Sequence, residues 1–143
     1  DVAQKQLAIL ESEGVSPSAW VWVHAQNIGS GHLLLKAAEK GAWISLDALR
    51  TANYYEQRDG ASITVNRHLE LLMLLRKEGF LKQVLLSHDG SSYPQKGKSK
   101  RTFEVLFTTF IPMMRAAGCS DAEISQLIVK NPRRAYTIRK RLI

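Results

Sequence analysis

The chain alternates short, continuously apolar runs with longer amphipathic stretches. Three runs rich in β-branched or aromatic residues predict buried strands over 20–23, 42–46 and 84–87. Apolar residues at helical spacing predict helices over 2–13, 29–40, 63–78, 102–117 and 120–130. Pro112 predicts a kink in the fourth of these helices, and Asn131-Pro132 is expected to start a last helical turn. Longer polar loops are expected over 48–62 and 90–100.

The order of these elements predicts the class of fold. Strands that alternate with helices form right-handed βαβ units, and such units build a parallel sheet. Three strands are too few to close a barrel, and the outer strands are as apolar as a central strand. The chain also opens at Asp1, without an initiator methionine and within a predicted helix. We therefore expect an α/β protein that is one portion of something larger.

Each predicted strand is followed by a residue that can bind a metal ion or move a proton. His24, Asp47 and Asp89 follow the first, second and third strand. Because the carboxyl ends of parallel strands share one rim of a sheet, these side chains could converge there. Nitrogen and oxygen ligands of this kind suit zinc, manganese or cobalt. Each residue could instead be structural: an aspartate can start a turn, and a histidine after a buried strand can be a hydrogen-bonded core residue.

Composition narrows the class of protein. Of the 143 residues, 45% are hydrophobic and 23% are charged, which is typical of a globular protein. No apolar run reaches the roughly 18–20 residues of a membrane span, so no membrane partner is expected. The single cysteine, Cys119, excludes an internal disulfide and a cysteine-based zinc cluster. With no recognisable signal peptide, the expected location is the cytoplasm.

The chain is basic, with a net charge of +7, and its basic residues are clustered. One cluster lies over 96–101 and the other near the C-terminus, where it comprises Lys130, Arg133, Arg134, Arg139, Lys140 and Arg141. Such clusters can bind nucleic acid. No aromatic interleaving or nucleic-acid motif accompanies them, so we expect solvated surfaces and no nucleic-acid partner. A basic binding module remains an alternative function.

Several stretches together resemble the phosphotriesterase family, including the phosphotriesterase homology proteins, within the amidohydrolase superfamily. The matching stretches are 11–18 (ESEGVSPS), the strand that ends at His24, 41–47 (GAWISLD), 79–89, 107–112 (FTTFIP) and Asn131-Pro132. The resemblance implies that residues 1–143 form the C-terminal part of one (β/α)8 TIM-barrel domain, with its sixth to eighth strands. The N-terminal half of the barrel would then be absent from this chain.

The resemblance also implies a centre of two divalent metal ions, with zinc expected first and manganese or cobalt as alternatives. By position, His24 matches a histidine that binds the more exposed metal. Asp89 matches an aspartate that binds the buried metal and takes a proton from the attacking nucleophile. A bridging carboxylated lysine would come from the missing half. The implied function is a metal-dependent hydrolase, acting on a small-molecule ester, lactone or phosphoester, and a homodimer is expected.

Other residues receive lesser roles from the same resemblance. Tyr54, Arg58 and Tyr93 lie in the two long loops and could line a substrate site, or could be plain loop surface. Asp47 is a further candidate for substrate binding, although a supporting role near the metal is the more natural expectation. Independently of the resemblance, the place of His68 on a predicted helix leads us to expect that it faces solvent or an interface.

Two departures from the family's pattern bear on the substrate. Organophosphate-hydrolysing members place a histidine directly after the seventh-strand aspartate, where this chain has Ala48, and a relay carboxylate where this chain has Asn27. Lactone or other ester hydrolysis is therefore favoured over phosphotriester hydrolysis. A non-catalytic descendant of the barrel is the alternative.

Overall fold

A parallel sheet forms the centre of the protein. The computed structural model describes residues 2–49, 52, 64–90 and 103–143. Its strands are β1 (Val21–Trp22), β2 (Trp43–Leu46) and β3 (Val84–Leu86), in the spatial order β1-β2-β3. Trp22 pairs with Ile44 in the first ladder, and Ile44 pairs with Val84 in the second. Both ladders are parallel, so the predicted α/β fold is confirmed.

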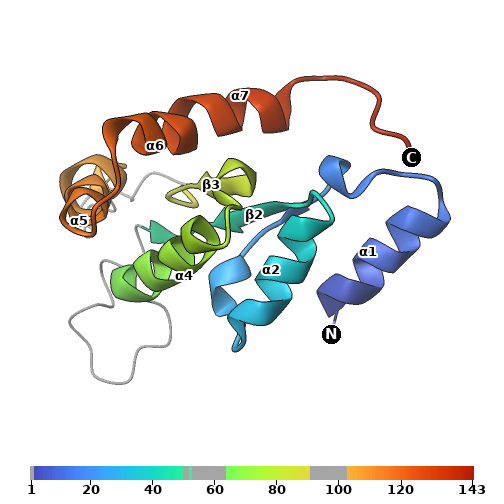
Figure 1. Ribbon diagram of the computed structural model, residues 1–143, viewed down its shortest axis with the longest axis horizontal. Coiled ribbons are helices and arrows are strands. Elements are labelled where there is room, and N and C mark those ends of the chain that lie inside the picture. The colour runs from blue at the N-terminus through green and yellow to red at the C-terminus, as the bar shows by residue number, and fades with distance from the viewer. Residues whose placement is uncertain (1, 50–51, 53–63, 91–102) are drawn as a thin grey trace, which may run out of the picture.

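Helices cover one face of this sheet. They are α1 (Val2–Ser12), α2 (Gly31–Glu39) and α4 (Val65–Lys77), and α2 and α4 lie side by side against the sheet (Figure 1). Each is close to its predicted range. Short 3-10 turns precede or follow the strands: η1 (Pro17–Ala19), η2 (Ala25–Asn27) and η3 (Leu81–Gln83). The resulting order of strands and helices is that of successive βα units.

The C-terminal third is mainly helical and runs alongside β3, at one side of the sheet (Figure 1). Its first part is a π-helical segment, η4 (Leu106–Phe110), which continues into α5 (Ile111–Ala116). Its second part runs through α6 (Asp121–Ser125), the π-helical segment η5 (Gln126–Lys130) and α7 (Asn131–Tyr136). Each α-helix that follows a π-helical segment has proline in its first turn. Because proline has no N–H to donate, the backbone bonds shift to the wider π pattern just before it.

Two predictions about these segments need correction, and one is confirmed. The helix predicted over 102–117 does not include Phe103 or Glu104, because the helical conformation begins at Val105. The prediction that Asn131-Pro132 starts a last helical segment is confirmed by α7, which begins at Asn131 and follows η5 without a break, because Lys130 and Asn131 both have right-handed helical angles. The loop predicted over 48–62 begins with helical residues: Leu49 is helical, and the amide of Ala52 donates to the carbonyl of Ala48.

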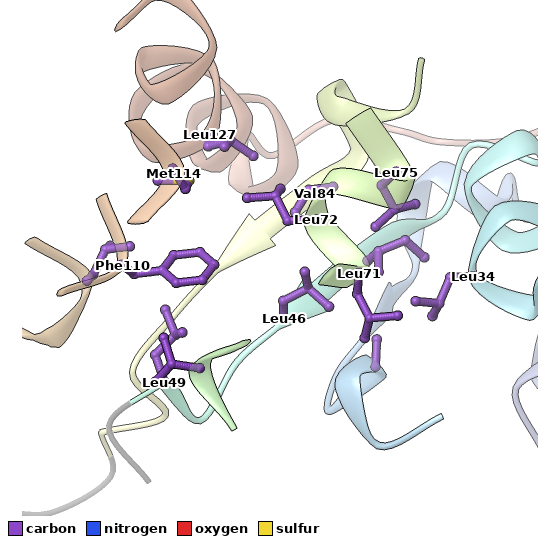
Figure 2. Packing of buried hydrophobic residues seen from close by; sticks show 14 of the residues in the cluster. Leu34, Leu46, Leu49, Leu71, Leu72, Leu75, Val84, Phe110, Met114 and Leu127 are labelled. Carbon is purple, nitrogen blue, oxygen red and sulfur yellow. The ribbon is translucent and has the colours of Figure 1, made fainter. Parts of the chain in front are cut away.

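The hydrophobic core lies between the sheet and its helices. Figure 2 shows how Leu46 and Val84 of the sheet meet Leu71, Leu72 and Leu75 of α4, with Phe110, Met114 and Leu127 closing the C-terminal side. Ile44 and Leu46 of β2 point into this cluster. Side chains alternate along a strand, so Trp43, Ser45 and Asp47 face the other way. That opposite face carries a second small cluster of Trp43, Leu85 and Ala135 with Val21.

The helices end where the sequence predicts. Gly41 and Gly79 follow α2 and α4 with φ angles of 94° and 84°. These left-handed angles suit glycine, and they let the next residues donate back to the last helical turn: Ala42 to Ala37, and Phe80 to Leu75. The chain then turns directly into β2 and, through η3, into β3.

An ion pair joins α4 to α6 and predicts a pH dependence of stability. Arg76 donates to both carboxylate oxygens of Glu123 (2.6 and 3.2 Å), and the amide of Ser120 donates to Glu123 as well. These hydrogen bonds lower the pKa of Glu123 from 4.5 to about 2, and the hydrogen bond from Arg76 has the largest effect. Because this pKa is lower in the folded state, the stabilisation is complete above about pH 4.5 and is lost as the pH falls toward 2.

We therefore predict that Glu123→Gln lowers the melting temperature at neutral pH, and that its difference from wild type disappears near pH 2. Thermal melts between pH 7 and 2 measure this difference. Glu70→Gln, which breaks the more exposed pair of Glu70 with Arg67 on α4, is the matched control and should have a smaller effect. A Glu123→Gln difference that stays constant across this pH range would contradict the assignment.

Candidate active site

Asp47 is the centre of a hydrogen-bond network at the carboxyl ends of β1 and β2. Its side chain is 7% exposed, and its carboxylate accepts four hydrogen bonds. Two come from His24: the backbone amide at 2.8 Å and the ring nitrogen Nδ1 at 2.6 Å. The others come from Gln26 Nε2 at 3.0 Å and Ser45 Oγ at 3.1 Å. Asp47 thus fixes the position of His24 across neighbouring strands.

The network determines the orientation of the His24 ring. Asp47 acts as the acceptor toward its other partners, so Nδ1 of His24 is the donor in their contact. The hydrogen bond to Asp47 is the main effect that raises the pKa of His24. The charge of Asp47 adds to it, burial opposes it, and the charge of Asp89 contributes a smaller rise. In the neutral ring the lone pair is then on Nε2. The side chain is 52% exposed, which leaves it accessible.

Gln26 and Ser45 also support this arrangement, although neither residue was predicted from the sequence to belong to the site. The buried Gln26 side chain donates to Asp47 Oδ1 and accepts from the amide of Asp47 at 3.2 Å, so one amide group pairs with both. Ser45 precedes Asp47 by two residues on the same face of β2. The position of Ser45 could have been predicted, because side chains two residues apart on a strand point to the same face. Gln26 lies in the 3-10 helix η2, where no such alternation indicates which way its side chain points.

The prediction that His68 faces solvent or an interface is wrong. The residue is fully buried. Nε2 of its ring lies 2.5 Å from the carbonyl of Asp47, and Nδ1 lies 2.7 Å from the carbonyl of Thr64. Thr64 also caps α4, accepting from the amide of Arg67 at 3.0 Å. His68 therefore ties the first turn of α4 to the end of β2 and supports the backbone that carries Asp47.

The third strand end delivers Asp89 to the same rim. Asp89 is exposed, and its amide donates to Ser87 Oγ at 3.1 Å. Its negative charge makes a small contribution to the raised pKa of His24, so Asp89 acts electrostatically on the His24 ring. His88, the residue before it, turns toward the helices: Nε2 accepts from the amide of Leu106 at 3.0 Å. The strand thus places His88 in the packed layer and Asp89 at the rim.

Backbone strain is concentrated at these strand ends. Among the described residues other than glycine, a positive φ occurs at His24 (54°), Ala48 (59°) and Asp89 (51°). His24 lies just after β1, Ala48 just after β2 and Asp89 just after β3. A left-handed conformation costs about 1–2 kcal/mol for such residues, and strain of this kind gathers at functional sites. The rim is therefore built to hold specific side chain directions.

The donor set fits part of a metal site. A histidine whose Nδ1 is held by a carboxylate presents Nε2 to a metal, an arrangement common among metal-binding histidines. Asp89 offers an exposed carboxylate on the same rim. No group of three or more histidine, cysteine, aspartate or glutamate residues that could hold a metal ion occurs within the described ranges. A catalytic zinc takes about three protein ligands, so further ligands would have to come from elsewhere.

The remaining residues predicted to affect substrate binding are not part of the hydrogen-bond network around Asp47. Tyr54, Arg58 and Tyr93 lie outside the described residues, so their part in substrate binding stays a prediction. Asn27 is exposed and lines a hollow beside His24, and Ala48 is buried. No helix in the described parts of the chain is both long enough and apolar enough to cross a membrane.

The fold and the rim define this protein as three βα units from the C-terminal portion of a (β/α)8 barrel, with polar residues gathered where barrel enzymes place their catalytic groups. The chain belongs to the phosphotriesterase family, which it matches over residues 2–136.

Individual relatives agree with this assignment. The phosphotriesterase homology protein of Escherichia coli (strain K12) is 29% identical over 129 residues, covering 90% of this chain and 41% of the relative. N-acetyltaurine hydrolase of Dictyostelium discoideum is 27% identical, covering 94% of this chain and 37% of the relative. A crystal structure of a phosphotriesterase homology protein from Escherichia coli, complexed with phosphate in its active site, has a TM-score of 0.74 and 27% identity. It covers 90% of this chain and 42% of that one, so the chain spans about two fifths of the length of these relatives.

Proposed function

We propose that this chain carries part of the active site of a metal-dependent hydrolase that acts on ester or lactone bonds of small molecules. The observation that carries the proposal is the contact of 2.6 Å between Asp47 and Nδ1 of His24, which leaves Nε2 of His24 as the ring nitrogen that can bind a metal ion, at the carboxyl end of a sheet that also bears Asp89. Membership of a family that includes hydrolases supports the reaction class.

Each residue of the rim has a specific task in this proposal. His24, through Nε2, and Asp89, through its carboxylate, are metal ligands, and two divalent ions are expected, with zinc first and manganese or cobalt as alternatives. When bound, such ions supply Lewis acidity toward the carbonyl or phosphoryl oxygen of the substrate. Asp89 accepts the proton of the attacking water, because a carboxylate at the rim is accessible to it. Asp47, Gln26 and Ser45 keep His24 in place.

The side chains of Asn27 and Ala48, an amide and a methyl group, support carboxylic esters and lactones as substrates. An amide and a methyl group cannot pass protons between a leaving group and solvent. Reactions that need an additional proton relay are therefore disfavoured at this rim, in line with a preference for lactones over phosphotriesters.

The outer edge of β1 supports the proposal that a further half of the barrel packs here. A hollow of about 410 Å³ runs along this edge and is lined mainly by apolar side chains, among them Trp20, Val21, Trp22 and Val23. Val23 is 57% exposed. An apolar, unpaired strand edge pairs readily with another strand. We propose that the strands of the N-terminal half occupy this edge and supply the remaining metal ligands, including the carboxylated lysine.

The experiment is a hydrolysis assay with the full-length protein against a panel of lactones, aryl esters and phosphotriesters. We expect turnover of lactones or esters, its loss on treatment with a chelator, and its return with zinc, manganese or cobalt. Turnover that persists in chelator would overturn metal dependence. A protein inert toward the entire panel, whatever metal is added, would favour a non-catalytic descendant of the barrel.

A further inference from the structure

We propose that a second site, at the opposite rim of the sheet, binds a small polyanion of the diphosphate class. A hollow of about 450 Å³ is lined by Lys82, Gln126, Lys130, Arg133 and Arg134. Lys82 belongs to η3, which precedes β3, whereas Asp89 follows the other end of that strand. The hollow therefore lies at the amino end of β3, away from the rim that carries His24 and Asp89.

The charge of the hollow is unbalanced. Four of its five lining side chains are cations and the fifth is an amide. Within the described part of the chain, none of these cations forms an ion pair with a carboxylate. The acidic residues of the same helical run are engaged elsewhere, Asp121 with Arg115 and Glu123 with Arg76. Cations brought together without an anion repel one another, and a multiply charged anion would relieve that repulsion.

The arginines are not needed to cap the end of α7. Cations near a helix C-terminus commonly bind its free carbonyl groups. Here Arg141 donates to the carbonyls of Arg134 (3.1 Å) and Ala135 (2.7 Å), and the hydroxyl of Thr137 donates to the carbonyl of Arg133. These carbonyl groups are therefore already satisfied. Arg134 Nη1 makes one long hydrogen bond, to the carbonyl of Lys82 at 3.5 Å, and no ion pair among the described residues engages the guanidinium group of Arg133 or Arg134.

The framework of the hollow is rigid. Asn131 is fully buried, and its Nδ2 donates to the carbonyls of Leu81 (2.8 Å) and Val84 (2.6 Å), which joins α7 to both ends of η3. Gln126 Nε2 donates to Asn131 Oδ1 at 2.6 Å. Arg134 lies over the ring of Trp43, 5.6 Å from its centre. Figure 1 shows α7 passing beside the turn that leads into β3.

These features together favour a phosphate-bearing ligand. Guanidinium groups bind phosphate oxygens in pairs, and lysines add point charges. Four cations from η3, η5 and α7 surround a space larger than a single phosphate requires, so two linked phosphate groups match both the charge and the size. A longer polymer such as RNA is not favoured, because the cations surround a hollow and do not form a stripe.

Calorimetric titration of the full-length protein with sodium pyrophosphate at low salt tests this site. The variant is Lys130→Gln/Arg133→Gln, which removes two exposed lining cations without changing the core. The matched control is Lys5→Gln/Lys77→Gln, which removes two exposed charges from α1 and α4. We expect pyrophosphate to bind about tenfold more weakly to the first variant, a loss of about 1.4 kcal/mol, and equally well to the control and wild type. Single Lys130→Gln replaces the double variant if the latter melts at a lower temperature than wild type.

A further variant, His24→Ala, separates this site from the candidate active site. Pyrophosphate binding that survives His24→Ala and is weakened by Lys130→Gln/Arg133→Gln supports the proposal. Binding that is lost in His24→Ala but unchanged in Lys130→Gln/Arg133→Gln would place the anion at the other rim and overturn it. An absence of binding to wild type would overturn it equally.

Discussion

The full-length protein with Asp89→Asn is expected to lose about 10²–10⁴-fold in kcat toward its best ester or lactone substrate. Asparagine keeps the shape of the side chain and tolerates the positive φ of 51° at this position. It cannot accept a proton, and its neutral oxygen is a weaker metal ligand than a carboxylate. Asp89 is exposed, so the melting temperature should stay close to that of wild type.

Steady-state kinetics and a thermal melt measure the two effects separately. Asp121→Asn is the matched control, because that carboxylate is 83% exposed and pairs with Arg115, far along the chain from the rim. It should leave kcat unchanged. An Asp89→Asn protein with wild-type turnover would remove Asp89 from the reaction.

Asp47→Asn is expected to weaken metal binding by about 10–100-fold, the usual cost of losing a carboxylate behind a metal-binding histidine. In wild type, both oxygens of Asp47 accept hydrogen bonds, from His24, Gln26 and Ser45. An amide has one acceptor oxygen only, so at least one of these buried donors loses its partner. We also expect a fall in melting temperature, since an unpaired buried donor costs about 1–3 kcal/mol.

Metal titration of the chelator-treated, full-length protein measures the affinity. Ser45→Ala is the graded control, because it removes one of the four hydrogen bonds to Asp47 and leaves those from His24 intact. Its metal affinity should stay within a few-fold of wild type. If Asp47→Asn bound metal as tightly as wild type, the supporting role of Asp47 would be wrong, and its predicted role in substrate binding would become the better hypothesis.

The sequence predicted the strands well because their chemistry is local. The continuous apolar run before Asp47 reflects a strand, β2, that is buried on both faces, and the glycines at 41 and 79 mark helix ends that need a positive φ. The prediction of a buried strand before His24 is wrong in its burial, because Val21 and Trp22 of β1 are half-buried and Val23 is exposed at the edge of the sheet. Parallel pairing then follows from the alternation of elements, and it brings the polar residues to one rim. The positions of His24, Asp47 and Asp89 at one rim of the sheet could therefore be predicted from the sequence.

What could not be predicted depends on tertiary contacts. The two π-helical segments arise where a helix meets proline within a packed layer, and a single-residue pattern does not distinguish them from α-helix. His68 looked like a surface residue of an amphipathic helix, but its burial is set by the carbonyl of Asp47, 21 residues away in the chain. Likewise, Gln26 gains its role only once β1 and β2 are adjacent. Such pairings exist only in the folded protein.

The metal content of the full-length protein tests the central claim most directly. Native mass spectrometry of wild type, His24→Ala and Asp89→Asn reports the mass of the chain, its assembly and its bound ions together. We predict about two divalent ions per wild-type chain, fewer in His24→Ala, where one ligand is lost, and fewer in Asp89→Asn. A wild-type protein that stays free of metal when zinc, manganese and cobalt are supplied would contradict the account. So would variants that bind as many ions as wild type.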